Sequence, residues 1–302
     1  MPDLVTALRD AGLDDVVSDA PAGPLTTLRV GGPLHALVTV NRPEELEAVG
    51  RVAATRGADV IVVGRGSNML VADTGFPGIA LRLGHGFRQV HIDGRIVEAG
   101  AAAALPTVAR LVAEAGLAGL AWMAAVPGSV GGAVRMNAGA HGGETRDLLR
   151  EATVTRLGER PRRWTPAELD FGYRHSALTA SDVVLDATFE LESGDAEQIR
   201  REMDEIRTWR REHQPLNEPN CGSVFTNPPN DSAGRLVEAA GCKGLRVGGA
   251  MVSQRHANFI VTRPGATAAD VSQLIEQVTE AVVRTHGVRL ATEVVRVGWE
   301  TG

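Results

Sequence analysis

Two short segments hold side chains suited to acid–base or anion-binding chemistry. Arg174 stands in FGYRHS (171–176) beside the only tyrosine, and its guanidinium could bind a carboxylate or phosphate through two parallel hydrogen bonds. Ser223 stands in CGSVFTNP (221–228), where its hydroxyl could donate a hydrogen bond or a proton. Taken alone, a surface arginine and a structural serine are the more common explanations, so the surroundings of each residue must decide.

Glu293 is the best candidate for a catalytic acid from the residues alone. It stands in LATEVVRV, which we expect to be a strand with Glu293, Ala291, Val295 and Val297 on one face. A carboxylate on an apolar face is costly unless it is paired or functional. Arg296 would lie on the opposite face, so we do not expect it to pair with Glu293.

A first glycine-containing loop, GRGSN (64–68), directly follows an apolar run that predicts a strand. Backbone N–H groups in such a turn can form a concave site for an anion such as phosphate. The loop has neither the GxGxxG pattern nor a following GK[ST], so it is not a Rossmann or Walker A sequence. On this motif alone a plain tight turn is the simpler interpretation.

A second segment, VPGSVGGAVRMNAGAHGG (126–143), contains six glycines. Val130, Val134 and Met136 are spaced to be buried, which predicts an ordered segment and argues against a flexible linker. We expect it to wrap a ligand that leaves no room for side chains, such as a dinucleotide pyrophosphate or a flat ring. The alternative is a close crossing of two backbone segments.

No metal site is predicted. The eight histidines show no HExxH pattern, and the two cysteines, Cys221 and Cys242, form neither a CxxC motif nor a disulfide framework. His256 and Asn258 in SQRHANFI are expected to be structural or to orient a ligand.

The composition is that of an ordinary globular protein. The chain has 302 residues and a net charge of −6 without a basic stripe, which argues against nucleic-acid binding. The first residues lack the apolar core of a signal peptide, and no run approaches the roughly 18 apolar residues of a membrane span. We therefore expect a cytoplasmic protein without membrane insertion.

Hydrophobic periodicity alternates between helix and strand, which predicts a mixed α/β or α+β fold. The expected helices begin at the N-caps Asn41 and Asp195, at Leu105, at Gly234 and at the capping box of Thr267. The expected strands are 59–64, 79–83, the hairpin 89–99 through Asp93-Gly94, 151–157, 182–191, 256–261 and 288–298.

Seven sequence blocks follow one another along the chain: TLRVGGP (27–33), VGRGSNMLVADTGF (63–76), PGSVGGAVRMNAGAHGGE (127–144), FGYRHS (171–176), QPLNEPNCGSVFTNPP (214–229), AGRLVEAAGCKGLRVGGAMVSQRHANFIV (233–261) and TEV (292–294). In this order they resemble the MurB family of UDP-N-acetylenolpyruvoylglucosamine reductases. The resemblance covers nearly the whole chain from about Thr26, and the role of the residues before it stays open.

The resemblance implies an α+β fold with an FAD-binding unit of the vanillyl-alcohol-oxidase (PCMH) type in two subdomains, 1–84 and 85–194. A C-terminal α+β substrate domain, 195–302, would follow. The family holds FAD non-covalently and takes electrons from NADPH. It reduces UDP-N-acetylglucosamine enolpyruvate to UDP-N-acetylmuramate for peptidoglycan synthesis, and so serves cell-wall biogenesis, cell shape and division.

The resemblance also implies residue roles. Arg174 and Glu293 would polarise the carboxylate region of the substrate, and Ser223 would protonate the enolate carbon. Substrate contacts are expected from Arg210, Gln214, Asn227 and His256. Cofactor contacts are expected from Gly64, Arg65, Gly66, Ser67, Asn68, Met69, Pro127, Gly128, Ser129, Gly131, Gly132, Asn137, Ala138 and Gly139.

Three positions depart from the family pattern. Thr226 replaces a basic residue, His141 replaces a common tyrosine, and Val295 occupies the arginine position of an E-x-R motif, with Arg296 displaced by one. Either the strand is bulged or another arginine makes that contact. The chain lacks the extra tyrosine-bearing loop of one subgroup, so it resembles the shorter subgroup.

Two alternative functions compete with the reductase. One is a flavin oxidase of the same superfamily, and the other is a non-catalytic binding protein on a reductase scaffold.

Overall fold

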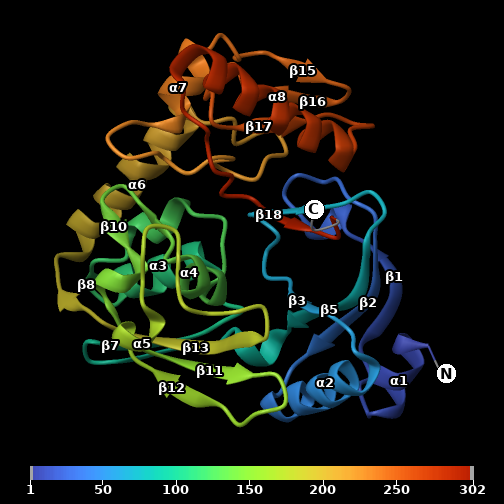
Figure 1. Cartoon of the computed structure of the whole chain (residues 1–302). Helices are drawn as coiled ribbons and strands as arrows, with labels where there is room; N and C mark the ends of the chain where they lie inside the picture. Colours follow the sequence, from blue (N-terminus) through green and yellow to red (C-terminus); the bar gives the residue numbers. More distant parts are fainter. Residues whose placement is uncertain (1–2, 300–302) are drawn as a thin grey trace. The chain divides into compact units, whose positions relative to one another are not determined.

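The computed structural model describes residues 3–299. These residues form two compact units, each with its own hydrophobic core (Figure 1). The first unit contains the residues up to 18, 35–64 and 78–209; the second contains 19–34, 65–77 and the residues from 210 onwards. The three domains expected from the resemblance have other boundaries and stay a prediction. Their outermost residues, 1–2 and 300–302, lie outside the described part of the chain.

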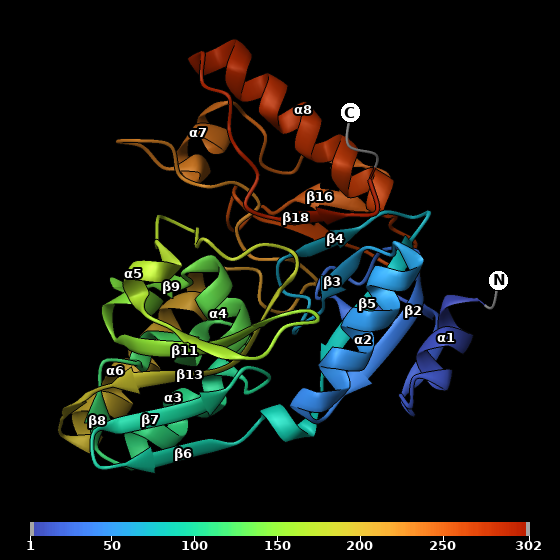
Figure 2. The ribbon, with the colours of Figure 1, turned by 60° about the horizontal axis from the view of Figure 1, so that its bottom comes forward.

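One sheet has the strand order β1-β2-β5-β3, with β3 parallel to β5. Figures 1 and 2 show helix α2 lying along this sheet, and α1 packs against α2. The elements are α1 (Leu4–Asp10), β1 (Val16–Pro21), β2 (Pro33–Val40), α2 (Pro43–Arg56), β3 (Val60–Val62) and β5 (Phe76–Leu83).

Helix α2 begins later than predicted. Its N-cap is Arg42, which forms a capping box with Glu45, whereas the Asn41 side chain accepts a hydrogen bond from the His85 N–H at 2.9 Å. The prediction of Asn41 as N-cap was therefore wrong, because a partner 44 residues away takes its side chain. The predicted end at Gly57 is confirmed, with a left-handed φ of 60°.

The second sheet of the first unit is antiparallel, in the order β12-β11-β13-β7-β6. The predicted hairpin through Asp93-Gly94 is confirmed. Helix α4 packs on β13 and β7, whose residues Ala99, Ala187 and Phe189 are buried. The elements are β6 (Val90–Asp93), β7 (Ile96–Gly100), α3 (Leu105–Glu114), α4 (Val130–Met136), β11 (Leu149–Arg156), β12 (Arg162–Trp164), α5 (Pro166–Leu169) and β13 (Asp182–Glu190).

Smaller elements complete this unit. The two-residue strands β8 (Leu117–Ala118) and β14 (Glu192–Ser193) pair with each other, as do β9 (Gly139–Ala140) and β10 (Gly143–Glu144). Helix α6 (Ala196–His213) starts in the first unit and ends in the second. Asp195 caps it as predicted, because its carboxylate accepts a hydrogen bond of 2.8 Å from the Glu197 N–H.

The second unit is built on the antiparallel sheet β15-β16-β17, against which α8 packs. A parallel pair, β4 with β18, joins two distant segments of the chain. The elements are β4 (Met69–Val71), α7 (Ala233–Ala239), β15 (Arg246–Val247), β16 (Ala250–Val252), β17 (Ile260–Thr262), α8 (Ala268–His286) and β18 (Val295–Val297). The capping box of Thr267 at the start of α8 is confirmed.

Two predicted strands are much shorter in the structure. Only Ile260–Thr262 is strand in the region predicted at 256–261, and only Val295–Val297 in the region predicted at 288–298. Both regions are held mainly by side-chain and isolated backbone bonds, which a hydrophobic pattern does not reveal.

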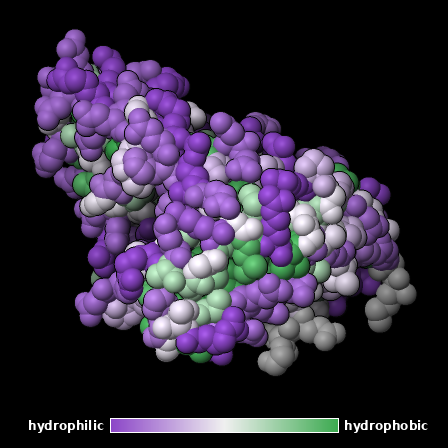
Figure 3. All heavy atoms as spheres, turned by 90° about the horizontal axis from the view of Figure 1, so that it is seen from above, coloured by the Kyte–Doolittle hydropathy of each residue, from purple (hydrophilic) through white to green (hydrophobic). Residues whose placement is uncertain are grey.

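Seen from above the orientation of Figure 1, hydrophilic residues cover much of the surface, and hydrophobic residues gather in one area (Figure 3). None of the helices within residues 3–299 is long and apolar enough to cross a membrane.

Candidate functional site

The glycine-rich segment 126–143 is ordered, as predicted. Ser129 caps α4 by accepting from the Gly132 N–H, and the segment pairs with residues 103–105 through hydrogen bonds to and from Gly128 and Val130. A Cβ atom on Gly139 would lie 2.6 Å from the Gly143 oxygen, and one on Gly143 only 2.4 Å from the Trp122 ring. A close approach of two backbone segments therefore explains Gly139, and the packing of the Trp122 ring explains Gly143.

Gly132 is different because it is exposed and faces open space. Only the Ser129 hydroxyl lies within 4 Å of the position a Cβ would take, at 3.4 Å. The exposed Gly64 also lies next to this hydroxyl, since a Cβ on Gly64 would be 2.9 Å from it. The two glycine-containing segments therefore meet at Ser129, and both leave bare backbone there.

The loop GRGSN follows β3, as predicted. Among the described residues, the backbone N–H groups of residues 64–68 donate to no protein acceptor, although Gly66 is buried. The loop is held instead through its carbonyls: the Thr27 N–H donates to the Gly66 oxygen at 3.1 Å. Several neighbouring N–H groups that lack a protein acceptor could donate hydrogen bonds to an anion such as a phosphate.

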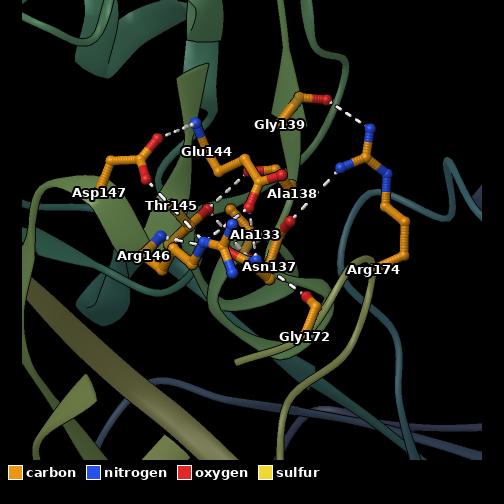
Figure 4. A network of polar contacts seen from close by, with 10 residues as sticks. All are labelled: Ala133, Asn137, Ala138, Gly139, Glu144, Thr145, Arg146, Asp147, Gly172 and Arg174. Carbon is orange, nitrogen blue, oxygen red and sulfur yellow. Dashed lines mark hydrogen bonds and ion pairs between the residues drawn. The ribbon is translucent and has the colours of Figure 1, made fainter. Parts of the chain in front are cut away.

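Arg174 lies against the glycine-rich segment within the first unit. Its guanidinium donates to the carbonyl oxygens of Gly139 at 2.7 Å and Asn137 at 3.5 Å (Figure 4). The backbone of Arg174 has a φ of 54°, in a turn closed by two hydrogen bonds between Gly172 and His175. Two motifs that are distant in the sequence thus form one local arrangement.

Ser223 and Glu293 lie on neighbouring segments of the second unit. Residues 291–293 run antiparallel to 224–226, and the Glu293 N–H donates to the Val224 oxygen at 2.8 Å. Both side chains are half-buried. The predicted apolar face around Glu293 was wrong, because Glu293 precedes β18 and Val295 is 45% exposed.

Arg296 is directed toward helix α8. Its guanidinium hydrogen-bonds the Ser272 hydroxyl, lies 3.8 Å from a carboxylate oxygen of Glu276 and stacks 4.4 Å from the Trp299 ring centre. These contacts favour the second of the two expected explanations, in which another arginine makes the contact of the E-x-R motif.

Asn258 has a structural importance that the sequence left open. It is buried and clamps Phe225 with both ends of its amide: Oδ1 accepts from the Phe225 N–H at 2.9 Å and Nδ2 donates to the Phe225 oxygen at 2.8 Å. Its own carbonyl accepts from the Val224 N–H at 2.9 Å. Asn258 therefore fixes the backbone that directly follows Ser223.

Cys221 is not a nucleophile at this site. Burial, together with the nearby negative charge of Glu293, raises the pKa of its thiol to about 12. The thiol therefore stays protonated at neutral pH.

The four predicted substrate residues all lie in the second unit. Arg210 donates to Gln214 at 2.5 Å, and burial lowers the pKa of its guanidinium. Asn227 accepts from the Ala233 N–H at 3.0 Å at the start of α7. His256 accepts from the Asn258 N–H at 3.2 Å, and burial, aided by Lys243, lowers its pKa and favours the neutral ring.

The comparisons with known proteins cover both units. Residues 34–158 match an FAD binding domain, and residues 214–297 match the C-terminal domain of UDP-N-acetylenolpyruvoylglucosamine reductase. A relative of that name from Heliobacterium modesticaldum is 45% identical over 280 residues, which are 92% of this chain and 89% of the relative. The chain belongs to the UDP-N-acetylenolpyruvoylglucosamine reductase family. A member from Methylorubrum extorquens is 43% identical over 98% of this chain and 97% of its own.

Solved structures agree with this family. The reductase (MurB) from Thermus caldophilus superposes with a TM-score of 0.82 and 38% identity, over 94% of this chain and 98% of that one. Berberine bridge enzyme from Eschscholzia californica has a TM-score of 0.50 at 14% identity, over 64% of this chain and 44% of that one. The second likeness concerns the fold alone; together with the match to an FAD binding domain and the reductase structure, it supports the predicted α+β architecture with an FAD-binding unit of the vanillyl-alcohol-oxidase type.

Proposed function

We infer that this chain is an FAD-dependent oxidoreductase that uses NADPH to reduce UDP-N-acetylglucosamine enolpyruvate to UDP-N-acetylmuramate, a peptidoglycan precursor. The observation that carries this inference is that one chain matches both an FAD binding domain and the reductase's C-terminal domain. We place the reaction in the cytoplasm, where both soluble substrates would be available.

The residues of the two glycine-containing segments fit FAD. The backbone N–H groups of 64–68, which bond to no protein acceptor, suit its pyrophosphate, and the open backbone at Gly132 leaves room beside Ser129. We therefore propose that two sets of residues hold the cofactor without a covalent bond: residues 64–69, and Pro127, Gly128, Ser129, Gly131, Gly132, Ala138 and Gly139. When bound, FAD would accept a hydride from NADPH and supply it to the substrate.

Arg174 and Glu293 are proposed to act on the carboxylate end of the substrate. Addition of a hydride to the terminal carbon of the enolpyruvyl double bond pushes the π electrons toward the carboxylate and creates an enolate. A fixed guanidinium stabilises this developing negative charge, because it needs no reorganisation during the reaction. Arg174 meets that requirement, since two backbone carbonyls hold its guanidinium.

Ser223 is proposed to complete the reaction as general acid. Its hydroxyl gives a proton to the carbon next to the carboxylate, and the second new C–H bond forms there. A serine hydroxyl is a weak acid in water, so this role needs a rigid and electrostatically favourable site. The clamp of Asn258 on Val224 and Phe225 supplies rigidity directly beside Ser223.

Arg210 and Gln214 are proposed to contact the substrate directly. Asn227 and His256 already bond to protein groups, so we propose that they shape the substrate site through the segments they hold. We keep the three-domain division, with boundaries after residues 84 and 194, as part of this proposal.

The test follows the colour of bound flavin under anaerobic conditions. NADPH should bleach the flavin, and UDP-N-acetylglucosamine enolpyruvate should then restore the oxidised spectrum. A flavin that bleaches and is reoxidised only by oxygen would favour an oxidase. A purified protein that takes up no FAD on reconstitution would favour the non-catalytic scaffold.

A further inference from the structure

The side-chain amide of Asn137 makes hydrogen bonds to other groups of the protein through both its nitrogen and its oxygen. The residue is 0% exposed and has a left-handed φ of 40° at the end of α4. Its Nδ2 donates to Glu144 Oε2 and to the Gly172 oxygen, both at 2.9 Å, and its Oδ1 accepts from the Arg146 N–H at 3.0 Å (Figure 4). Both amide hydrogens therefore have partners, and none is left for a ligand.

These bonds connect Asn137 to Arg174 from two sides. The Gly172 carbonyl that accepts from its amide lies two residues before Arg174, in the turn closed between Gly172 and His175. The Asn137 carbonyl in turn accepts from the Arg174 guanidinium, next to the shorter bond to Gly139. Asn137 thus contacts both the backbone that carries Arg174 and the end of its side chain.

The turn needs such support. A positive φ at an arginine is unfavourable and persists only when neighbouring contacts impose it. Arg174 has a φ of 54°, and the Asn137 amide bonds directly to the turn that contains it. Without that bond the turn would have fewer contacts that favour the strained conformation.

Glu144 fixes the orientation of the amide. Its carboxylate can only accept hydrogen bonds, so the nitrogen end of the Asn137 amide must face it, and the oxygen end must face the Arg146 N–H. The carboxylate is itself held by the Arg146 side chain at 3.0 Å, and the Glu144 N–H donates to Asp147 at 2.8 Å.

We propose that Asn137, oriented by Glu144, is a positioning residue that holds Arg174 in its working geometry for the reduction of the substrate. The proposal rests on the role proposed above for Arg174. It differs from the cofactor contact that the family resemblance implies for Asn137, because the amide hydrogens are bound within the protein.

The test uses Asn137→Gly, since glycine adopts a φ of 40° without strain and the change removes the side-chain amide together with its Cβ. Flavin reduction by NADPH and flavin reoxidation by the substrate are measured separately in the FAD-loaded protein. We expect the first rate to stay within about twofold and the second to fall roughly 10- to 100-fold, as misplacement of a catalytic group does. Asn230→Gly is the matched control, because Asn230 is exposed and has a φ of 62°.

Two further variants separate the possible failures. Arg174→Ala should slow reoxidation, and Asn137→Gly should add little to it in the double variant, because both act through one guanidinium. Glu144→Gln keeps an oxygen acceptor and should react nearly normally, whereas Glu144→Ala should resemble Asn137→Gly. If Asn137→Gly is not obtained folded, the pair of Glu144 variants carries the same test.

The outcomes are distinct. Normal reoxidation in Asn137→Gly, with slow reoxidation in Arg174→Ala, overturns the positioning role and leaves the proposed function intact. Loss of FAD, or equal slowing of both half-reactions, assigns Asn137 to cofactor binding and overturns the proposal. Normal reoxidation in Arg174→Ala refutes the role of Arg174 itself, and the proposal with it.

Discussion

The side-chain amide of Asn68 donates a hydrogen bond of 3.0 Å to the backbone oxygen of Glu293, which is 225 residues away in the sequence. The same two segments meet again one step further on, where the Val295 N–H donates to the Asn68 oxygen at 3.1 Å. They then continue as the parallel pair β4–β18. The end of the loop proposed to hold the cofactor is therefore joined directly to the segment that carries Glu293, within the second unit.

We expect Asn68→Asp to slow flavin reoxidation by the substrate. The replacement has the same shape but loses the N–H donor and sets a negative charge against the Glu293 carbonyl. Loss of one such bond costs about 1 kcal/mol, which corresponds to roughly fivefold in rate if it is felt in the transition state. The measurement is stopped-flow reoxidation, with the FAD dissociation constant determined alongside. A weaker FAD affinity with unchanged reoxidation would show that Asn68 serves the cofactor only.

Ser223→Ala should separate the two half-reactions. Flavin reduction by NADPH should proceed at its normal rate, because no proton transfer from Ser223 is involved. Reoxidation by the substrate should fall by roughly 100- to 10,000-fold, the range of general acid catalysis. Thr226→Ala, three residues further along the same segment, serves as the control. The assignment of Ser223 as the acid fails if reoxidation is as fast as in the unchanged protein.

Asn258→Ala should lower the free energy of unfolding and also slow reoxidation of the flavin by the substrate. The change leaves the buried N–H and carbonyl groups of Phe225 without their side-chain partners, at a cost of about 2–4 kcal/mol in the free energy of unfolding. Denaturant unfolding measures that loss, and Asn217→Ala, at an exposed asparagine of the same unit, is the control. A change below about 0.5 kcal/mol would contradict the importance of this clamp.

The sequence predicts the local features of this fold well. The hairpin at Asp93-Gly94, the cap of α6 at Asp195 and the capping box of Thr267 all depend on residues within a few positions of one another. Such signals are read directly from spacing. The family resemblance adds the fold and the activity, because seven ordered motifs contain more information than any one of them.

The surroundings of the candidate site residues could not be predicted in the same way. Asn258 binds Phe225 across 33 residues, and Asn137 binds Gly172 across 35. Hydrophobic periodicity does not reveal such pairs, so the sequence predicts Glu293 on an apolar strand, whereas strand β18 begins only at Val295. The glycine content of 126–143 predicts a ligand for the segment as a whole, whereas the Gly143 backbone already excludes a side chain at Gly139 and the Trp122 ring excludes one at Gly143.

The pH dependence of stability should separate two aspartates on strand β13. Burial of Asp182, whose side chain is 1% exposed, raises its pKa, but hydrogen bonds from Thr179 and Arg156 outweigh burial and hold the pKa below 3.8. The ionised carboxylate therefore stabilises the native state at neutral pH, and this contribution is lost as the pH falls below 3.8. Asp182→Asn should unfold more easily at pH 7, and the difference from the unchanged protein should shrink in acid.

Asp186→Asn should have the opposite effect. Burial, aided by repulsion from Glu98, raises the pKa of Asp186 above 3.8 despite a hydrogen bond from Thr153. Its ionised form is therefore disfavoured in the native state, and stability falls as the pH rises through the native pKa. The neutral amide removes that penalty, so the variant should melt at a higher temperature than the unchanged protein at pH 7. Thermal unfolding of both variants between pH 3 and pH 7 provides the measurement. Melting curves that shift in the same direction for Asp182→Asn and Asp186→Asn at pH 7 would contradict this account of their electrostatics.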